Sequence, residues 1–378
     1  MERTARPGQG RLATALGVTR VARVTGLDRT GVEVACAVRP GGHVLQVTNG
    51  KGLGLRAAAA GALGEAAELA FSEQVPPRAL CWGTAGELRS RGVVILAPEQ
   101  LGGERTTTLP IAWRGGTDLR SGRPVLVPAV SVHVPPPGGA PLGVSELRWT
   151  SNGMGAHSSR PAALLHALLE LVERHELALA LPDGWTEEAV RCFRLSSAAA
   201  ERAAPGAAAL AQRLERRGFS VYLFALPGRV GLPTAAALLF DAEHSAVPLT
   251  VGYACRLDLD GAVLAALLEA AQSRLTDIHG AREDVAPAER RGVERLRRAC
   301  RAGELDPDRD RPLTPVLSPV GGEGDGGHPD PDRGCRTVLR ALRRAGFPDA
   351  IAVDLAPDGF PLRVVKVLVP GLLLSELL

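Results

Sequence analysis

The chain has few aromatic residues, almost no lysine and no dense run of basic residues. Phe, Trp and Tyr make up 3% of its 378 residues, and the net charge is only +3. Nucleic-acid binding usually needs aromatic stacking platforms and a concentrated basic surface, so a nucleic-acid partner is not indicated. The hydrophobic fraction of 45% still supports a sizeable core, which Leu, Val and Ala must build.

Metal-binding cysteine motifs and long apolar runs are also missing. The six cysteines form no CxxC and no Cys/His cluster with zinc-ligand spacing, so we expect reduced, mostly buried thiols. No stretch of about 18 apolar residues occurs, which argues against a membrane span. The basic N-terminus is not followed by an apolar segment of the kind found in signal peptides. We therefore expect a cytoplasmic protein without a membrane partner.

The order of the elements predicts an α+β fold, with mixed or antiparallel sheets packed against long helices. Strands are expected within 18–48 and at 93–97, 110–113, 124–134, 219–226, 234–240, 247–257, 350–355 and 363–369. Helices are expected at 56–71, 161–181, 198–217, 260–278, 288–302 and 335–345.

The domain organisation predicted from these elements is simple. Residues 1–14 are expected to be a flexible N-terminus, and 15–378 a single domain. A Gly-, Pro- and Asp-rich segment at 303–334 is expected to be a mobile loop. The two early helical segments are loosely alike, which indicates a possible internal duplication.

Three apolar helical segments each carry a polar pair three residues apart: Glu65 and Glu68, Glu170 and Glu173, and Glu269 and Gln272. Residues at this spacing share one face of a helix, where two glutamates repel each other. Buried carboxylates must be paired or must bind a metal, and Mg²⁺ with a polyphosphate is the obvious candidate. The alternatives are a solvated helix face and, for the second pair, neutralisation by Arg174 and His175.

Several other polar residues lie beside these pairs. Lys51 stands between glycines in NGKG, which is either an ordinary turn or a place where backbone and point charge meet a phosphate. His166 lies one turn before Glu170 on the same helix face. Arg274 follows the third pair, and Arg282 stands in the turn beyond it. Arginine can pair a phosphate through two hydrogen bonds.

Three blocks in this order resemble the YcaO family. They are NGKGLGLRAAAAGALGEAAE, SNGMGAHSSRPAALLHALLELVER and EAAQSRLTDIHGARED. The opening VTRVARVTGLDRTGVEVACAVRP and the closing IAVDL and VVKVLVPGL segments are similar to the family as well. No P-loop, GxSxG elbow, HExxH or dinucleotide fingerprint competes with this interpretation.

The resemblance implies an enzyme that uses ATP and Mg²⁺ to activate the oxygen of a peptide-backbone amide by phosphorylation. It implies that the magnesium ions are held by Glu65, Glu68, Glu170, Glu173 and Glu269. The residues expected to bind the nucleotide are Lys51, His166, Gln272, Arg274 and Arg282. The attacking nucleophile would decide whether the product is a thioamide, an azoline or an amidine.

The chain ends in GLLLSELL, without the Pro-rich tail of many azoline-forming members, and leaves no length for a leader-recognition domain. It thereby resembles stand-alone members that form thioamides with a TfuA partner. Expected partners are a precursor peptide and a TfuA-like or separate leader-binding protein, with a homodimer possible. Gly61, Ala265 and His175 replace residues usual in the family. They support the alternative of a catalytically idle nucleotide-binding or scaffolding subunit.

Overall fold

The computed structural model describes residues 7–103, 109–241, 246–280, 290–302 and 330–373. Arg282 and most of the loop expected at 303–334 lie outside these described residues. From residue 330 onward the chain is described again, and α10 (Pro331–Arg344) begins there.

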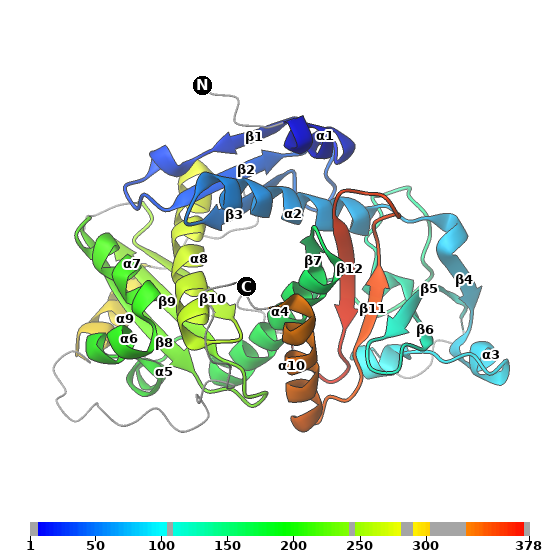
Figure 1. The fold of residues 1–378 in the computed structure, drawn as a ribbon. Coiled ribbons are helices and arrows are strands. Elements are labelled where there is room, and N and C mark those ends of the chain that lie inside the picture. Colours follow the sequence, from blue (N-terminus) through cyan, green and yellow to red (C-terminus); the bar gives the residue numbers. More distant parts are fainter. Residues whose placement is uncertain (1–6, 104–108, 242–245, 281–289, 303–329, 374–378) are drawn as a thin grey trace.

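Three antiparallel sheets form the framework (Figure 1). The first has the order β1-β2-β3 and consists of β1 (Arg20–Arg23), β2 (Glu33–Val38) and β3 (Val47–Gly52). The second has the order β10-β9-β8 and consists of β8 (Phe219–Leu226), β9 (Thr234–Asp241) and β10 (Leu249–Cys255). A long helix follows each of them, α2 (Leu55–Glu73) after β3 and α8 (Leu259–His279) after β10.

The third sheet has the order β4-β5-β11-β12-β7, with β6 paired to β5. Its strands are β4 (Leu80–Gly83), β5 (Ile111–Asp118), β6 (Pro124–Pro128), β7 (Met154–His157), β11 (Ile351–Asp354) and β12 (Arg363–Leu368). Helix α4 (Arg160–Ala180) follows β7 and packs on β12 and α10. This architecture confirms the predicted α+β class with antiparallel sheets.

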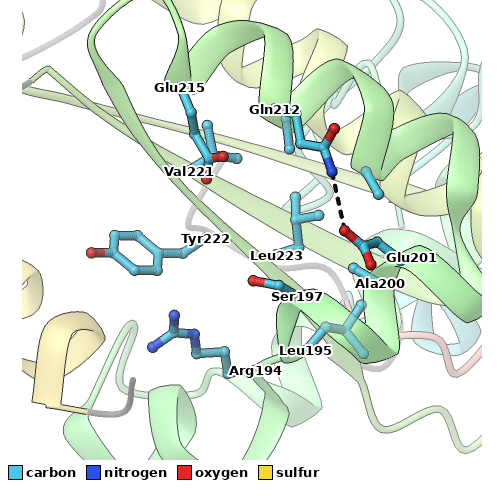
Figure 2. Close-up of a pocket in the computed structure, with 12 residues that line it drawn as sticks. Arg194, Leu195, Ser197, Ala200, Glu201, Gln212, Glu215, Val221, Tyr222 and Leu223 are labelled. Atoms are coloured by element: carbon cyan, nitrogen blue, oxygen red, sulfur yellow. Dashed lines mark hydrogen bonds between the residues drawn. The ribbon is translucent and has the colours of Figure 1, made fainter. Parts of the chain in front are cut away.

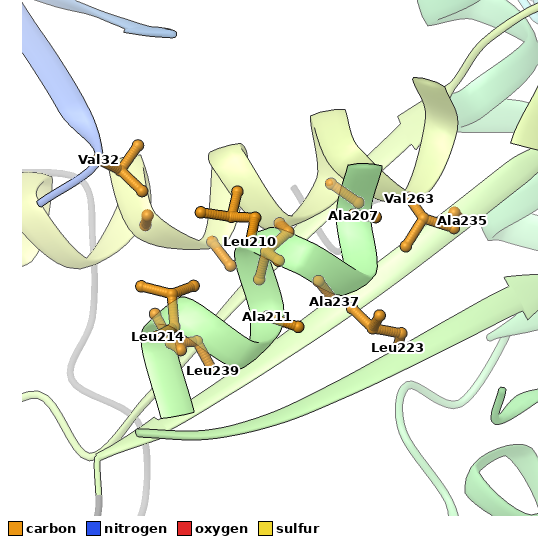
Figure 3. Packing of buried hydrophobic residues seen from close by; sticks show 14 of the residues in the cluster. Val32, Ala207, Leu210, Ala211, Leu214, Leu223, Ala235, Ala237, Leu239 and Val263 are labelled. Atoms are coloured by element: carbon orange, nitrogen blue, oxygen red, sulfur yellow. The ribbon is translucent and has the colours of Figure 1, made fainter. Parts of the chain in front are cut away.

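Small aliphatic residues fill the core beneath the second sheet. Helices α7 (Pro205–Glu215) and α8 pack there on β8 and β9, with Leu210, Leu214 and Val263 among the buried side chains (Figure 3). The other helices are α1 (Pro7–Ala15), α3 (Ala85–Ser90), α5 (Glu187–Phe193), α6 (Ser197–Ala203), α9 (Arg290–Ala302) and the 3₁₀ turns η1 (Thr25–Leu27), η2 (Pro77–Ala79), η3 (Pro98–Leu101) and η4 (Ala129–Ser131).

Prolines account for two differences from the predicted elements. The strand expected at 93–97 is reduced to one bridge between Ile95 and Leu126, and Pro98 begins η3 directly after it. The single helix expected at 198–217 is divided at Ala204, because Pro205 lacks an N–H and disfavours helical geometry in the residue before it.

Two further segments also differ. The strand expected to run through 124–134 ends at Pro128, and η4 follows it. Helix α1 occupies residues 7–15, most of the stretch expected to be a flexible N-terminus, and Leu12 is buried in the core.

Three strand–helix units, β3–α2, β7–α4 and β10–α8, border the centre of the molecule (Figure 1). Each helix packs on the strand before it and also contacts the strand of the next unit. Helix α2 contacts β7, α4 contacts β10, and α8 contacts β3. The units therefore close into a ring, which extends the expected repeat of two segments to three.

A glycine in each strand of this ring lets the helix approach closely. A Cβ added to Gly50, Gly155 or Gly252 would collide with the backbone of the following helix. Strand and helix therefore touch backbone to backbone, which leaves no room for a side chain between them. Gly61 lies at the first of these crossings, where an added Cβ would come within 3.3 Å of the Gly50 Cα.

Candidate functional site

In each unit of the ring, the first glutamate of the helix accepts a hydrogen bond from the backbone near the preceding strand. The donors and acceptors are Asn49 N–H to Glu65 Oε2 (2.9 Å), Gly153 N–H to Glu170 Oε2 (2.8 Å) and Tyr253 N–H to Glu269 Oε1 (3.4 Å). The strands thus set the positions of three carboxylates through their main chains.

The second glutamate of a pair faces the strand of the next unit. The backbone of Ala156 in β7 acts on the Glu68 carboxyl and opposes the rise of its pKa. Glu173 accepts a hydrogen bond from Cys255 N–H in β10 (3.2 Å). On this evidence the ring brings together the five carboxylates predicted to bind metal, namely Glu65, Glu68, Glu170, Glu173 and Glu269.

Electrostatics confirm that these carboxylates act on one another. Burial raises the pKa of Glu68 well above its usual value, and the charges of Glu170 and Glu65 raise it further. Burial also raises the pKa of Glu173 to about 7, with Glu269 and Glu170 adding to the effect. The cluster therefore carries negative charge that the surrounding protein compensates only in part.

Both lysines of the chain lie at this cluster. Lys51 Nζ is 2.6 Å from Glu269 Oε2. Burial acts to raise the pKa of Glu269, but Lys51 brings it below the usual value. Lys366 is 1% exposed, and the charges of Glu170 and Glu68 act on it.

Arg174 forms a third positive group at the cluster. Its guanidinium lies 3.5 Å from both Glu170 and Glu173, so part of the predicted alternative, neutralisation within α4, is present. Its Nε and Nη1 have no hydrogen-bond partner among the described residues. His175 takes no part, because its Nδ1 accepts from Leu373 N–H (3.0 Å) and its ring packs edge-on against Phe347.

The structure places only some of the residues predicted to bind nucleotide beside the carboxylates. His166 and Gln272 lie on the helix faces of Glu170 and Glu269, and the structure records no hydrogen-bond partner for either side chain within the described ranges. Burial among charged groups lowers the pKa of His166. Arg282 falls outside the described residues.

Arg274, also predicted to bind the nucleotide, is paired with other protein groups in the structure. It is 3% exposed and donates to Asp28 Oδ2 (3.0 Å), Asp241 Oδ2 (2.7 Å) and the carbonyl of Val247. Five residues along α8 from Glu269, it projects about 140° away around the helix. Its side chain therefore fixes α8 to the second sheet and to the segment that follows η1, and it is not free to bind a phosphate.

Asn49 is a residue of the site that sequence reasoning missed. Its Nδ2 donates to Thr276 Oγ1 (3.1 Å), and Thr276 Oγ1 in turn donates to the Gln272 carbonyl (3.0 Å). This chain of donors fixes the amide orientation. Asn49 Oδ1 is buried and has no partner among the described residues. The signal in the sequence was its place in NGKG, two residues before Lys51 on the same face of β3.

The donor set of the ring fits Mg²⁺ together with phosphate. Within the described residues, no three acidic, histidine or cysteine side chains converge as ligands of one ion. Mg²⁺ characteristically uses one or two carboxylates plus substrate phosphates and water, and not a cage made only of protein. The raised pKa values of Glu68 and Glu173 and the unpartnered Asn49 Oδ1 and Arg174 Nε are consistent with that kind of site.

A hollow elsewhere among the described residues contains none of these side chains. It lies between α6, α7 and β8 and is lined by Arg194, Ser197, Glu201 and Gln212 among others (Figure 2). Gln212 donates to Glu201 (3.1 Å).

Among the described helices, none is long and apolar enough to cross a membrane.

Comparisons with known proteins agree with this geometry. The model of the YcaO family, described as an ATP- and Mg²⁺-binding cyclodehydratase, matches residues 49–373. An uncharacterized protein of Methanothermobacter thermautotrophicus is 33% identical over 371 residues, which cover 94% of this chain and 90% of the relative. An uncharacterized protein in the tfuA 3′ region of Rhizobium leguminosarum bv. trifolii is 30% identical, covering 94% and 84%.

Solved structures give the same result. YcaO from Methanopyrus kandleri, bound with AMPPCP and Mg²⁺, matches with a TM-score of 0.69 and 26% identity, over 96% of this chain and 88% of that one. A heterocyclase in complex with substrate and cofactor matches with a TM-score of 0.71 over 97% of this chain and 52% of that one; at 20% identity this supports the fold alone. ATP and Mg²⁺, the cofactors expected from the sequence, are those that the family description names. The chain therefore belongs to the YcaO family.

Proposed function

We propose that this protein uses ATP and Mg²⁺ to activate a backbone amide of a ribosomally made peptide, and that it forms a thioamide together with a TfuA-type partner. A sulfide donor adds to the amide carbon, and the carbonyl oxygen takes the γ-phosphoryl group of ATP. The carbon–oxygen bond then breaks, and phosphate leaves. The products are a thioamide, ADP and phosphate.

The observation that carries this proposal is the ring of five carboxylates with unpartnered polar groups beside it. Phosphoryl transfer depends mainly on positioning and on neutralising phosphate charge. Mg²⁺ bound by the carboxylates would supply most of that neutralisation. Lys51 and Arg174 would add fixed positive charge near the phosphates, and Asn49, His166 and Gln272 would contact the rest of the nucleotide.

The choice of a thioamide rests on weaker support. One relative is described by its place in the tfuA 3′ region, which favours a TfuA partner for this chain too. Two heterocyclases share the fold. Attack on the activated amide by a side chain of the peptide, in place of sulfide, would give an azoline. Azoline formation is therefore the competing product.

The test is a reconstitution read by mass spectrometry. The protein is incubated with candidate precursor peptide, ATP, Mg²⁺, a sulfide donor and the TfuA-type partner. We expect an ATP-dependent replacement of one oxygen by sulfur. Loss of one water would instead identify azoline or amidine formation, and no ATP-dependent change despite Mg²⁺·ATP binding would identify the idle subunit.

The matched variants are Glu170→Gln and Glu188→Gln. Glu170→Gln keeps an acceptor for Gly153 N–H but removes a predicted metal ligand. Changes in the outer shell of metal sites reduce activity by about 10- to 100-fold, so loss of a ligand should exceed about 100-fold. Glu188 is exposed on α5, and its variant should be fully active. Equal activity of the two variants would reject the metal assignment.

A further inference from the structure

Lys366 is a buried cation in the middle of the third sheet. It lies on β12, opposite Met154 of β7 and Val353 of β11, and is 1% exposed. Its ammonium donates to the backbone carbonyls of Thr150 (2.6 Å) and Asn152 (2.7 Å). A buried ammonium needs such acceptors, and here both come from one short segment before β7.

That segment, residues 150–153, is held by two neighbouring residues of β12. Lys366 binds its carbonyls, and Val367 N–H donates to the Gly153 carbonyl (2.8 Å). Gly153 has a φ of +79°, and an added Cβ would collide with the Val367 carbonyl, so only glycine fits there. The result is that Gly153 N–H points at Glu170 Oε2 (2.8 Å).

The ammonium also faces the acidic ring. Burial lowers the pKa of Lys366 to about 8, while the charges of Glu170 and Glu68 oppose the shift. The centroid of the Trp149 indole lies 5.8 Å from Lys366 Nζ. The structure records no hydrogen bond from Lys366 to a carboxylate among the described residues, so its direct contacts are with the segment and its action on the glutamates is through space.

We propose that Lys366 is a positioning residue of the metal site. By holding the carbonyls of Thr150 and Asn152 it aims Gly153 N–H at Glu170, and it thereby fixes the position of the Glu170 carboxylate before a metal binds. This inference rests on the proposed function. It also accounts for the lysine: a compact ammonium can serve two carbonyls in a sealed space, where the larger guanidinium of arginine would not fit.

Two effects of Lys366 on Mg²⁺ have opposite signs. Its charge repels the ion, whereas its hydrogen bonds organise a ligand of the ion. The hydrogen bonds are direct and short, and the repulsion acts at longer range, so organisation dominates. Removing the ammonium is therefore expected to weaken binding of Mg²⁺ with nucleotide, although simple charge removal would strengthen it.

The experiment compares wild type with Lys366→Met and Lys366→Gln. Calorimetry measures binding of Mg²⁺·AMPPCP, and hydrogen exchange measures protection of the Gly153 amide. We expect the methionine variant to bind about 10- to 100-fold more weakly, as is typical when a group that orients a metal ligand is removed. Its Gly153 amide should exchange faster. The glutamine variant keeps N–H donors and should retain more affinity.

Arg39→Met is the matched control. Arg39 is a buried cation that pairs with Glu73 (2.6 and 2.7 Å) outside the ring. Its loss should lower stability but leave Mg²⁺·AMPPCP affinity and Gly153 exchange unchanged. A purely structural role of Lys366 would make the two variants alike.

Affinity of Lys366→Met within about twofold of wild type, or tighter, overturns the inference, as does unchanged exchange at Gly153. If the methionine variant does not fold, the glutamine variant decides by the same two measurements. Failure of wild type to bind Mg²⁺·AMPPCP would reject the proposed function instead. Hydrogen exchange at Gly153 would still test whether Lys366 holds residues 150–153 in place.

Discussion

Arg274 and Glu173 are both buried charged residues, but only Arg274 has its full set of partners. Arg274 meets two carboxylates and a carbonyl, and such a satisfied network belongs to the scaffold. Glu173 has one backbone donor and an arginine at 3.5 Å, and its pKa is about 7. Buried groups with a shifted pKa and few partners, such as Glu173, are typical of functional sites.

His133 makes a residue-scale prediction about pH. Burial lowers its pKa to about 4, so the folded protein binds fewer protons than the unfolded chain between about pH 4 and 6.5. The contribution of neutral His133 to the free energy of unfolding, about 3 kcal/mol relative to low pH, is fully present above pH 6.5 and is lost as pH falls toward 4. Unfolding experiments across this range should show the loss.

His133→Asn provides the control for that measurement. Asparagine can still donate to the Ser72 carbonyl, which His133 Nδ1 contacts (3.3 Å), but it does not titrate. The variant should lose less stability than wild type between pH 6.5 and 4. Parallel curves for the two proteins would show that other groups cause the acid sensitivity.

The residues that sequence could identify are those whose partners lie on the same helix. The spacing of Glu170 and Glu173 indicated a shared face, and the structure brings the predicted carboxylates together. Asn49 and Lys366 escaped notice as site residues because their partners, Thr276 and the 150–152 carbonyls, are more than 200 residues away in the chain. The partners of Arg274, which lie on other elements, could not be foreseen from the sequence.

At the scale of elements, the strand–helix unit locates each glutamate. Gly252 of β10 touches the backbone of α8 between Ala266 and Ala270, beside Glu269. Thr250 Oγ1 donates to the Ala270 carbonyl (2.9 Å), and Thr48 makes the same kind of bond to Ala62 in the first unit (2.8 Å). These contacts fix the height and the rotation of the helix against its strand.

Gly252→Ala should therefore damage both stability and binding. The added methyl group must push α8 away from β10, and overpacking of this kind lowers the free energy of unfolding by about 1–3 kcal/mol. Denaturant titration would measure that loss, and calorimetry the weaker binding of Mg²⁺·AMPPCP. Gly115→Ala in β5, where an added Cβ meets nothing within 4 Å, should change neither. Equal effects of both variants would refute the close-contact explanation.

Long periodic elements were predictable, and short ones governed by neighbours were not. The helices at 55–73, 160–180 and 259–279 agree with expectation within two residues. The segment 93–97 has strand composition, but Pro98 and the short β6 leave it only one bridge. Helix α1 was missed because its stability comes from Leu12 packing into a distant core.

At the scale of the whole molecule, folding gathers negative charge at the centre of a weakly basic chain. The net charge is +3, yet five glutamates meet within the ring. Their repulsion opposes folding, and a bound cation relieves it. Fold stability and metal binding are therefore linked.

We expect Mg²⁺ to raise the thermal midpoint of the metal-free protein more than NaCl of equal ionic strength does. Saturation to about 100 times Kd stabilises a folded protein by about 2.7 kcal/mol. The double variant Glu68→Gln, Glu173→Gln should be more stable than wild type without Mg²⁺, because burial raises the pKa of both carboxyls and folding must then either bury their charge or protonate them. It should also respond less to the ion. Scanning calorimetry can measure both, and an equal response to the two salts would contradict the linkage.

The backbone contacts at Gly50, Gly155 and Gly252 have a consequence for how such a chain can change over time. Main chain meets main chain at each crossing, so the distance between strand and helix there does not depend on the size of an apolar side chain. Exchanges among Leu, Val and Ala in the surrounding core should then leave the distance between strand and helix at these crossings unchanged. A family built in this way can diverge widely in sequence while three glycines and a few carboxylates stay in place.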